Sequence, residues 1–342
     1  MKIYLDKSKP FFKANMHTHT TNSDGRATPE EIKREYKKRG YSVVAFTDHE
    51  VIIDNSHLTD DDFIAITGYE LEVVEPGKIW CPDTRQSVRV SHLNMYARDP
   101  HNIKTLCMSE GATRDAAKEI LPMAVFDGRD DLRVWSGEGI SKIIDYAHEN
   151  GFLVCYNHPS WSLESAKDFL EYKNLDFVEI FNTGAYKSGL HNDEHLFDTM
   201  VKNDKNVGCF AADDNHNVHG FDGALTDSFG GFIMINSEKL DYDSIIEALE
   251  KHDFYASCGP EIHSLTSEGD TVYVETSPVK VIVKQTEGRQ GGALIAENGE
   301  YITRASFKMK EHEKKFRIII EDEYGKRAYS QCYELSMHNT EE

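Results

Sequence analysis

Near its start the chain reads Met16-His17-Thr18-His19-Thr20, and Ser23-Asp24-Gly25 follows within one short loop. Similar clusters recur further along the chain at Thr47-Asp48-His49-Glu50, Gly68-Tyr69-Glu70, Tyr156-Asn157-His158-Pro159 and Asp213-Asp214-Asn215-His216. Each cluster stands at the end of an apolar run. Imidazole and carboxylate groups are the ligand types of multinuclear divalent-metal hydrolases, so the series predicts a metal site assembled from distant segments.

Apolar runs alternate with helical patterns over most of the chain. The runs predict strands at 12–19, 42–47, 63–67, 88–97, 152–156, 175–181, 207–211 and 231–235. The helical patterns cover 28–39, 140–150, 191–203 and 242–251, and the first begins with the capping sequence Thr28-Pro29-Glu30-Glu31. Strands that alternate with helices predict an α/β fold of βα units around a mostly parallel sheet.

The clusters fall at or just past the carboxyl ends of these predicted strands. Active sites of βα barrels assemble at that end of the sheet, so the position supports a shared site. His92 is less clear, because its predicted strand continues beyond it.

Two segments depart from the alternation. Residues 98–135 are polar and have weak periodicity, and they include the basic residues Arg98, Lys104, Arg114, Arg129 and Arg133; we expect an insertion over the site. After about His263 the helical patterns stop, and short alternating strands with turn signals at Asn298-Gly299 and Tyr324-Gly325 follow. These features predict a small antiparallel β domain at the end of the chain.

The composition narrows the classes of function. The chain has 342 residues, 39% of them hydrophobic, and a formal net charge of −21, which argues against long nucleic acid or an anionic membrane as a partner. No apolar stretch approaches the ~20 residues of a membrane span, and residues 1–15 lack a signal-peptide core, so we expect a cytoplasmic protein. The six cysteines form no Cys-x-x-Cys pair, which predicts small buried side chains in a reducing compartment.

On these residues the chain resembles the PHP (polymerase and histidinol phosphatase) superfamily, a distorted seven-stranded βα barrel with metals at the strand carboxyl ends. The matching motifs, in the family's order, are His17-x-His19, Ser23-Asp24-Gly25, Thr47-Asp48-His49, Gly68-x-Glu70, Ser91-His92-Leu93-Asn94, Asn157-His158-Pro159 and Asp214-x-His216. They cover roughly residues 12–262, and Tyr255–Ile262 is similar to a motif that ends the barrel in a subgroup with a C-terminal β domain. The resemblance implies a barrel over 1–262 and a β-sandwich-like domain over 263–342.

The resemblance also implies three divalent cations and their ligands. His17, His19 and Asp214 would hold one metal, and Glu70 would bridge it to a second metal that is also held by His92 and His158. Asp24, His49 and His216 would hold the third. Neutral imidazoles and carboxylates without thiolates suit Mn, Fe or Zn. Catalysis would rest on five of these residues: His17, His19, Glu70, Asp214 and His216.

Several neighbouring residues have roles that the sequence leaves open. Asp213 and Asp214 are adjacent, and we choose Asp214 as the ligand because of its Asp-x-His spacing to His216. Asp48 and Asn157, each beside a predicted ligand, are expected to orient an imidazole. Two further residues are open: Glu179 is a core-edge acid or a support for a ligand, and Asn182 is a candidate for contact with a substrate oxygen.

Other polar residues have a plainer interpretation. His191 and His195 have the i, i+4 spacing of a helical zinc pair, but they stand at an acidic helix start and are expected to be solvated or to support other ligands. His219 is expected to be a loop residue. The arginines of 98–135 could clamp a phosphate, although a solvated charged segment is the commoner outcome.

These observations predict a metal-dependent hydrolase. The resemblance implies cleavage of a phosphoester by a hydroxide that bridges two of three metals, with a small phosphorylated molecule as substrate. The ligand types alone support only metal-assisted hydrolysis, so cleavage of a C–O or C–N bond at the same site is the first alternative. A binding module whose metals only stabilise the fold is the second. The oligomeric state is left open.

Overall fold

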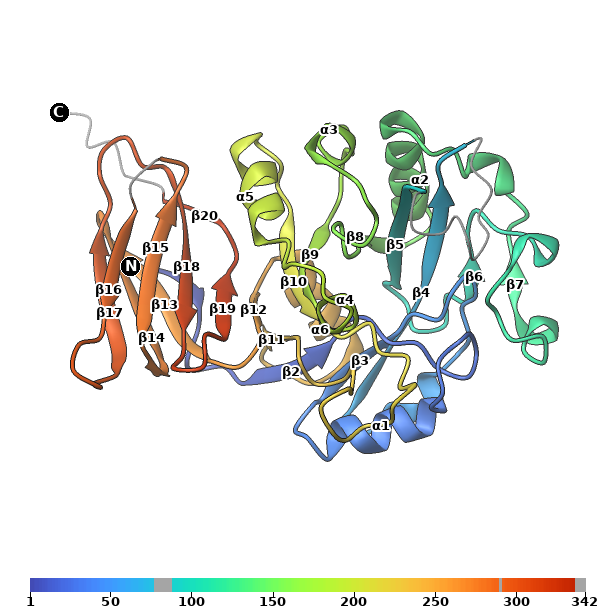
Figure 1. Cartoon of the computed structure of the whole chain (residues 1–342), viewed down its shortest axis with the longest axis horizontal. Helices are drawn as coiled ribbons and strands as arrows, with labels where there is room; N and C mark the ends of the chain where they lie inside the picture. The colour runs from blue at the N-terminus through green and yellow to red at the C-terminus, as the bar shows by residue number, and fades with distance from the viewer. Residues whose placement is uncertain (77–87, 289–290, 336–342) are drawn as a thin grey trace.

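The computed structural model of the chain describes residues 1–76, 88–288 and 291–335 (Figure 1). Most strands belong to one large mixed sheet. In spatial order it contains β10 (Gly208–Ala212), β9 (Phe177–Asn182), β8 (Phe152–Tyr156), β5 (Val90–Ala97), β4 (Ile64–Val74), β3 (Val43–Phe46), β2 (Phe11–Asn15), β11 (Phe232–Asn236), β12 (Phe254–Ser257), β19 (Arg327–Ser330), β18 (Lys315–Glu321), β15 (Val281–Thr286) and β16 (Gly292–Ile295), and β20 (Tyr333–Glu334) pairs with β18.

The part of this sheet between β10 and β2 is mixed in direction. The pairs β2–β3, β3–β4, β8–β9 and β9–β10 are parallel, whereas β5 runs antiparallel to both of its neighbours, β4 and β8. Just past the ends of β2 and β10, the Asp214 N–H donates to the His17 carbonyl and the His19 N–H donates to the Asn215 carbonyl, at 3.0 and 3.1 Å. The predicted combination of helices and strands is confirmed. The sheet is not mostly parallel as predicted, because β5 and β11 run antiparallel to both of their neighbours. Closure as a seven-stranded barrel stays a prediction.

Four helices overlap the predicted segments: α1 (Pro29–Lys37), α2 (Gly137–Glu149), α5 (Glu194–Lys202) and α6 (Tyr242–Glu250). Two short helices, α3 (Ala166–Phe169) and α4 (Thr183–Lys187), were not predicted. The predicted capping box of α1 is present, since Thr28 and Glu31 exchange side-chain to backbone hydrogen bonds. Gly40 follows this helix with φ +81°, a conformation that residues with a Cβ rarely adopt.

The segment 98–135 contains little regular structure. Two short parallel strands, β6 (Lys104–Thr105) and β7 (Val125–Phe126), pair with each other, and three single-turn 3₁₀ helices are η3 (Glu110–Ala112), η4 (Leu121–Met123) and η5 (Asp130–Leu132). In Figure 1 the strands β6 and β7 lie beside β4, at the far end of the molecule from the C-terminal strands.

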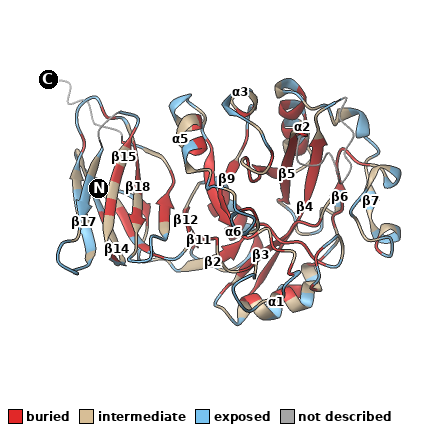
Figure 2. Ribbon diagram, viewed as in Figure 1, coloured by how far each residue is buried: buried red, intermediate tan, exposed pale blue. Residues whose placement is uncertain are grey.

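The main apolar core lies around the strands that carry the predicted site. Strands β3, β8 and β9 are buried along their whole lengths, as Figure 2 shows, which agrees with their continuous apolar sequences. Burial on both faces holds these strands rigidly, so side chains at their ends have defined positions.

A second core lies where a four-stranded sheet faces the last strands of the chain. This sheet has the order β1 (Lys2–Leu5), β13 (Ile262–Glu268), β14 (Thr271–Val279) and β17 (Ile302–Lys308). Leu5, Leu265 and Val274 from it pack in one cluster with Phe316 and Ile318 of β18. The first strand of the chain, β1, is hydrogen-bonded to β13 (Figure 1). Strand β12 pairs with β19 and so continues the large sheet into the C-terminal strands. The boundary after residue 262 stays a prediction.

The structure bears on two expectations from the composition, one about membrane-spanning segments and one about the cysteines. Among the described residues, no helix is long and apolar enough to cross a membrane. The five described cysteines (Cys107, Cys155, Cys209, Cys258 and Cys332) are free, and the first three are buried. Cys81 lies outside the described residues.

Candidate metal centre

The predicted ligands come from loops and strands at one end of the sheet. His17 and His19 follow β2, His49 follows β3, His158 follows β8, and Asp214 and His216 follow β10, while Asp24 lies in the loop before α1. Glu70 differs from the prediction, because it lies inside β4 rather than at its end, whereas His92 lies inside β5 as its predicted strand implied. Strand β4 continues past residue 67 because β5 pairs with it antiparallel as far as Val74.

The structure brings all nine predicted ligands together. Their ligand atoms form four overlapping groups, and within each group the atoms lie within 4.8 Å of one another. The groups are His19, Asp24, His49 and His216; His17, His19 and Glu70; His17, His158 and Asp214; and His49, Glu70 and His92. His17, His19, His49 and Glu70 each belong to two groups, so the assignment of ligands to individual metals stays a prediction.

Glu70 is buried at the base of the site and belongs to two of the four groups. Its Oε1 lies 3.0 Å from His92 Nδ1 and 3.2 Å from His158 Nε2, and its Oε2 lies 3.1 Å from His49 Nδ1. In addition, Oε1 lies 3.4 Å from His17 Nε2, and Oε2 lies 3.4 Å from His19 Nε2. This buried carboxylate therefore faces imidazoles from several strands, as a bridging ligand would.

Two imidazoles face each other beside Asp214. The Nε2 atoms of His17 and His19 are 3.1 Å apart, and they lie 3.2 and 3.0 Å from Asp214 Oδ1. On the open side, His216 Nε2 lies 3.2 Å from Asp24 Oδ1. Acceptor atoms converge here from separate segments, which is the arrangement that a cation requires.

Unpartnered buried atoms test whether a cation fits. His19 Nδ1, Glu70 Oε2 and His158 Nδ1 are buried and have no hydrogen-bond partner in the described part of the chain. Buried polar atoms are nearly always satisfied, and ring nitrogens and carboxylates are ligands of Mn, Fe and Zn. The residues therefore fit divalent cations.

Charges within the site perturb its pKa values in opposite directions. Burial lowers the pKa of His92, but Glu70 and Glu72 outweigh burial and raise it to about 10. Burial also lowers the pKa of His216, but Asp24 and Asp214 outweigh burial and raise it to about 9. Burial and the neighbouring imidazoles of His49 and His216 lower the pKa of His19 to about 3. Without cations, protons on His92 and His216 would balance part of the carboxylate charge.

The carboxylate of Glu179 supports two of the ligands. Its Oε1 lies 2.7 Å from His17 Nδ1, and its Oε2 accepts hydrogen bonds from the His158 N–H and from the Asn182 amide. Asn182 is buried; it also donates to Asp214 Oδ2 at 3.2 Å, and its Oδ1 accepts from the Ala185 N–H. Glu179 is thus a support for ligands, the second of the two roles left open.

Asp48 and Asn157 do not contact an imidazole through the hydrogen bonds of their side chains, contrary to the expectation. Asp48 accepts from the Thr20 N–H at 2.7 Å and from the hydroxyls of Thr20 and Ser23, which fastens the loop between His19 and Asp24. Asn157 donates to Glu70 Oε1 at 2.7 Å. Both residues hold the site, one through a loop and the other through a carboxylate.

The two adjacent aspartates face different surroundings. The Asp213 carboxylate accepts from the hydroxyls of Tyr36 and Thr183, at 2.8 and 2.7 Å. It also accepts from the backbone N–H groups of residues 229–231. Asp214 instead faces His17 and His19. Asp213 is therefore a structural anchor.

Three predicted polar candidates lie outside the centre. His191, His195 and His219 are exposed, and none belongs to a ligand group of the described residues. Two arginines of the 98–135 segment do reach the site region: Arg114 pairs with Glu72 at 2.8 Å and Arg133 pairs with Glu50 at 3.0 Å. Arg98 and Arg129 pair elsewhere, with Glu250 and Asp131.

A cavity of about 220 Å³ opens over the ligands. Besides predicted ligands, it is lined by Glu72, Asp115 and Trp161, which the sequence analysis did not single out. Glu72 could have been found from the sequence, because it is two residues from Glu70 and so lies on the same face of a strand. Asp115 and Trp161 could not, since their positions depend on how irregular loops fold back.

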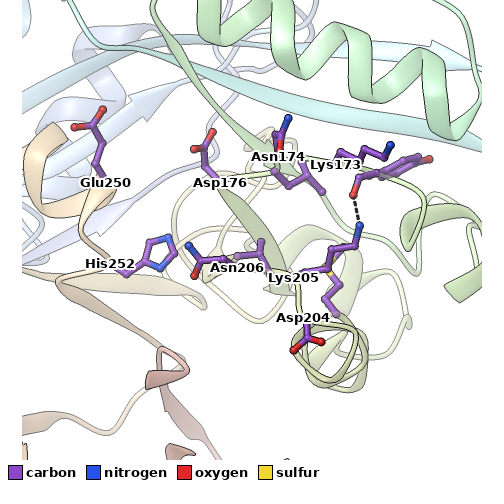
Figure 3. A pocket seen from close by; sticks show the side chains of 12 residues that line it. Lys173, Asn174, Asp176, Asp204, Lys205, Asn206, Glu250 and His252 are labelled. Atoms are coloured by element: carbon purple, nitrogen blue, oxygen red, sulfur yellow. Dashed lines mark hydrogen bonds between the residues drawn. The ribbon is translucent and has the colours of Figure 1, made fainter. Parts of the chain in front are cut away.

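A larger cavity of about 470 Å³ lies elsewhere (Figure 3). Its residues precede β9, β10 and β12, so it sits at the amino ends of these strands, whereas the ligands follow carboxyl ends. Asp176, Asp204, Lys205, Glu250 and His252 surround it, but it contains no ligand group of the described residues. Size alone does not make it the site of the chemistry.

The chain is similar in structure to a two-domain protein from Bacteroides vulgatus that contains a predicted PHP-like metal-dependent phosphoesterase, with 13% identity, coverage of 98% of each chain and a TM-score of 0.46. It is also similar to a proposed metal-dependent phosphoesterase from Bifidobacterium adolescentis, with 16% identity, coverage of 71% of this chain and 97% of the other, and a TM-score of 0.39. A third similar structure is an amidohydrolase from Chromobacterium violaceum with bound sulfate, with 12% identity, coverage of 59% and 87%, and a TM-score of 0.37. No protein-family model and no curated protein matches the chain. At such identities and TM-scores, the activity has to be argued from the chain's own site.

Proposed function

We propose that the protein is a metal-dependent hydrolase that cleaves a phosphoester of a small molecule at a centre of three divalent cations, Mn, Fe or Zn. The observation that carries the proposal is the convergence of nine His, Asp and Glu side chains in four overlapping groups, with buried ring nitrogens left unpartnered. We also infer that strands β2 to β5 and β8 to β10 form the distorted seven-stranded barrel that supports it.

Divalent cations held here would supply Lewis acidity toward a phosphoryl oxygen and a water molecule. His17, His19 and Glu70 are buried at the base of the site, where they would hold cations away from bulk solvent. The side chains of Asp24 and His216 are 45% and 26% exposed, so the site opens on their side and a substrate would enter there.

The cavity limits the size of the substrate. About 220 Å³ is below the roughly 300–1,000 Å³ of ordinary ligand pockets, which favours a phosphoryl group with a small alcohol. The net charge of −21 also disfavours long nucleic acid. Both observations support a small phosphorylated substrate.

The test combines metal analysis with a panel of substrates. Protein purified without chelator is expected to hold two or three transition-metal ions per chain by elemental analysis, and to hydrolyse at least one small phosphoester. Asp214→Asn should lower both metal content and rate, whereas His263→Gln, which alters an exposed histidine outside the centre, should change neither. Bound metals without hydrolysis of any phosphoester would favour an ester or amide of another kind as substrate, and absence of metals would refute the centre.

A further inference from the structure

We propose that Glu72 is a positioning residue for His92 and that Arg114, from the 98–135 segment, holds Glu72 in place. The segment would thereby set how tightly the His92 side of the centre binds its cation. This inference rests on the proposed function only in taking the centre to be a metal site. It assigns a role to a segment and to two residues outside the predicted ligand set.

The register of β4 and β5 places Glu72 directly opposite His92. Directly opposite residues have Cβ atoms about 4.5–5.5 Å apart, so their side chains meet on one face of the sheet. Glu70 is two residues away on the same strand and therefore lies on that face too. The His92 ring stands between two carboxylates: Nδ1 is 3.0 Å from Glu70 Oε1, and Nε2 is 3.6 Å from Glu72 Oε2.

The two ring nitrogens of His92 have different roles in a metal centre. Glu70 contacts ring nitrogens of other predicted ligands, so His92 Nδ1 points toward the centre. A ligating imidazole usually donates its other N–H to a carboxylate, which fixes the ring orientation and raises the basicity of the ligand. Glu72 Oε2 is the carboxylate oxygen on that side. At 3.6 Å it lies just beyond hydrogen-bond distance, and His92 Nε2 has no partner among the described residues.

The other oxygen of Glu72 is held from the 98–135 segment. Arg114 Nη1 donates to Glu72 Oε1 at 2.8 Å, which leaves Oε2 for His92. The Glu72 side chain is 9% exposed, so a charged partner is needed to keep a carboxylate there. Arg114 thus fixes the position of Glu72 without touching a predicted ligand itself.

A second arginine of the segment holds the backbone at the same place. Arg133 Nε and Nη2 donate to the Glu72 carbonyl at 3.0 and 2.7 Å, and Nη2 also donates to Glu50 Oε1. Glu50 follows the predicted ligand His49 and also accepts from the Arg114 N–H at 2.6 Å. The segment is therefore fastened to the residue after His49 and to β4, the strand that carries Glu70 and pairs with the strand of His92.

The experiment measures Zn²⁺ affinity of the full chain by competition with a chelating dye, together with thermal unfolding. Glu72→Gln should weaken the affinity about 10–100-fold, the usual effect of losing such a support. Glu72→Asp keeps the charge but is too short to reach both partners, and it should weaken affinity as well. Arg114→Ala should weaken affinity less than Glu72→Gln. Arg129→Ala is the matched control, since Arg129 lies on the same segment, pairs with the exposed Asp131 and lies over the Tyr146 ring, away from the predicted ligands.

The double variant separates positioning from general stability. If Arg114 acts through Glu72, Arg114→Ala combined with Glu72→Gln should bind Zn²⁺ within about twofold of Glu72→Gln alone. Losses that multiply would show that Arg114 acts by another route. Wild-type affinity in Glu72→Gln, or in Glu72→Asp, would overturn the positioning role while leaving the proposed function intact. A wild-type protein that binds no ion would instead refute the metal centre and this inference with it.

Discussion

Nδ1 of His17 lies 2.7 Å from Oε1 of Glu179, and both side chains are buried. The contact turns the other ring nitrogen of His17 toward Asp214 and Glu70. An imidazole that is held in this way presents one nitrogen to the centre and cannot rotate. The orientation of a predicted ligand that follows β2 is therefore set by a carboxylate on β9.

Glu179→Gln should lower the metal affinity about 10–100-fold, because the amide cannot match a carboxylate as acceptor for His17 and the His158 N–H. Affinity is measured by chelator competition, and thermal unfolding checks that the variant is folded. Glu261→Gln provides a control, since Glu261 pairs with the exposed His263 far from the ligands in sequence. Unchanged affinity in folded Glu179→Gln would contradict the supporting role.

Replacing the two adjacent aspartates should have opposite consequences. Asp214→Asn should lose metal but keep its fold, since it removes an anionic group that faces His17 and His19. Asp213→Asn should keep metal when folded but unfold more easily. Its amide would leave buried donors unpaired, at about 1–3 kcal/mol for each. Elemental analysis and chemical denaturation of both variants give the answer, and the reverse pattern would exchange the two roles.

Patterns that depend on neighbouring residues in the sequence could be predicted well. The capping box at Thr28 and Glu31 is local, and the structure contains it. The buried strand at 152–156 has the predicted bounds. The convergence of the ligands was predicted mainly from their positions at strand ends, because all parallel strands end at one edge of a sheet.

Features that depend on distant partners could not be predicted in this way. Nothing in residues 2–5 indicates that they pair with β13, because an edge strand takes its partner from the final packing. The length of β4 past Glu70 likewise depends on antiparallel pairing with β5. Asp213 and Asp214 look equivalent in the sequence, and only Tyr36 and the backbone at 229–231 distinguish them.

Metal binding should strengthen with pH. Burial lowers the pKa of His92 but Glu70 outweighs it, and the pKa values of His92 and His216 rise to about 10 and 9 without cations. Raised pKa values stabilise the ion-free fold fully below the unfolded pKa of about 6.5, and this contribution is lost as pH rises through 9–10. Cations must displace these protons. The rise in melting temperature on adding Mn²⁺ should therefore be larger at pH 8.5 than at pH 6.5. Variants of surface Lys and Asp residues serve as controls and should show the same difference between the two pH values as the wild type. A smaller rise at pH 8.5 would contradict the competition between protons and cations.

The C-terminal strands hold a buried ion pair whose loss should affect stability and leave the metals in place. Lys284 Nζ donates to Glu313 Oε2 at 2.7 Å and to the Lys308 carbonyl at 3.1 Å, and both charged side chains are at most 3% exposed. Glu313→Gln leaves the ammonium group without its charge partner, and removing one member of a buried pair costs about 3–5 kcal/mol.

Replacing both members, as in Lys284→Met with Glu313→Leu, should recover much of this loss because no uncompensated charge remains. Urea denaturation of the two variants measures the difference in the free energy of unfolding. Metal content should equal that of the wild type in both, because no ligand group of the described residues includes a residue after His216. If Glu313→Gln lost metal at unchanged stability, the C-terminal strands would contribute to the centre directly.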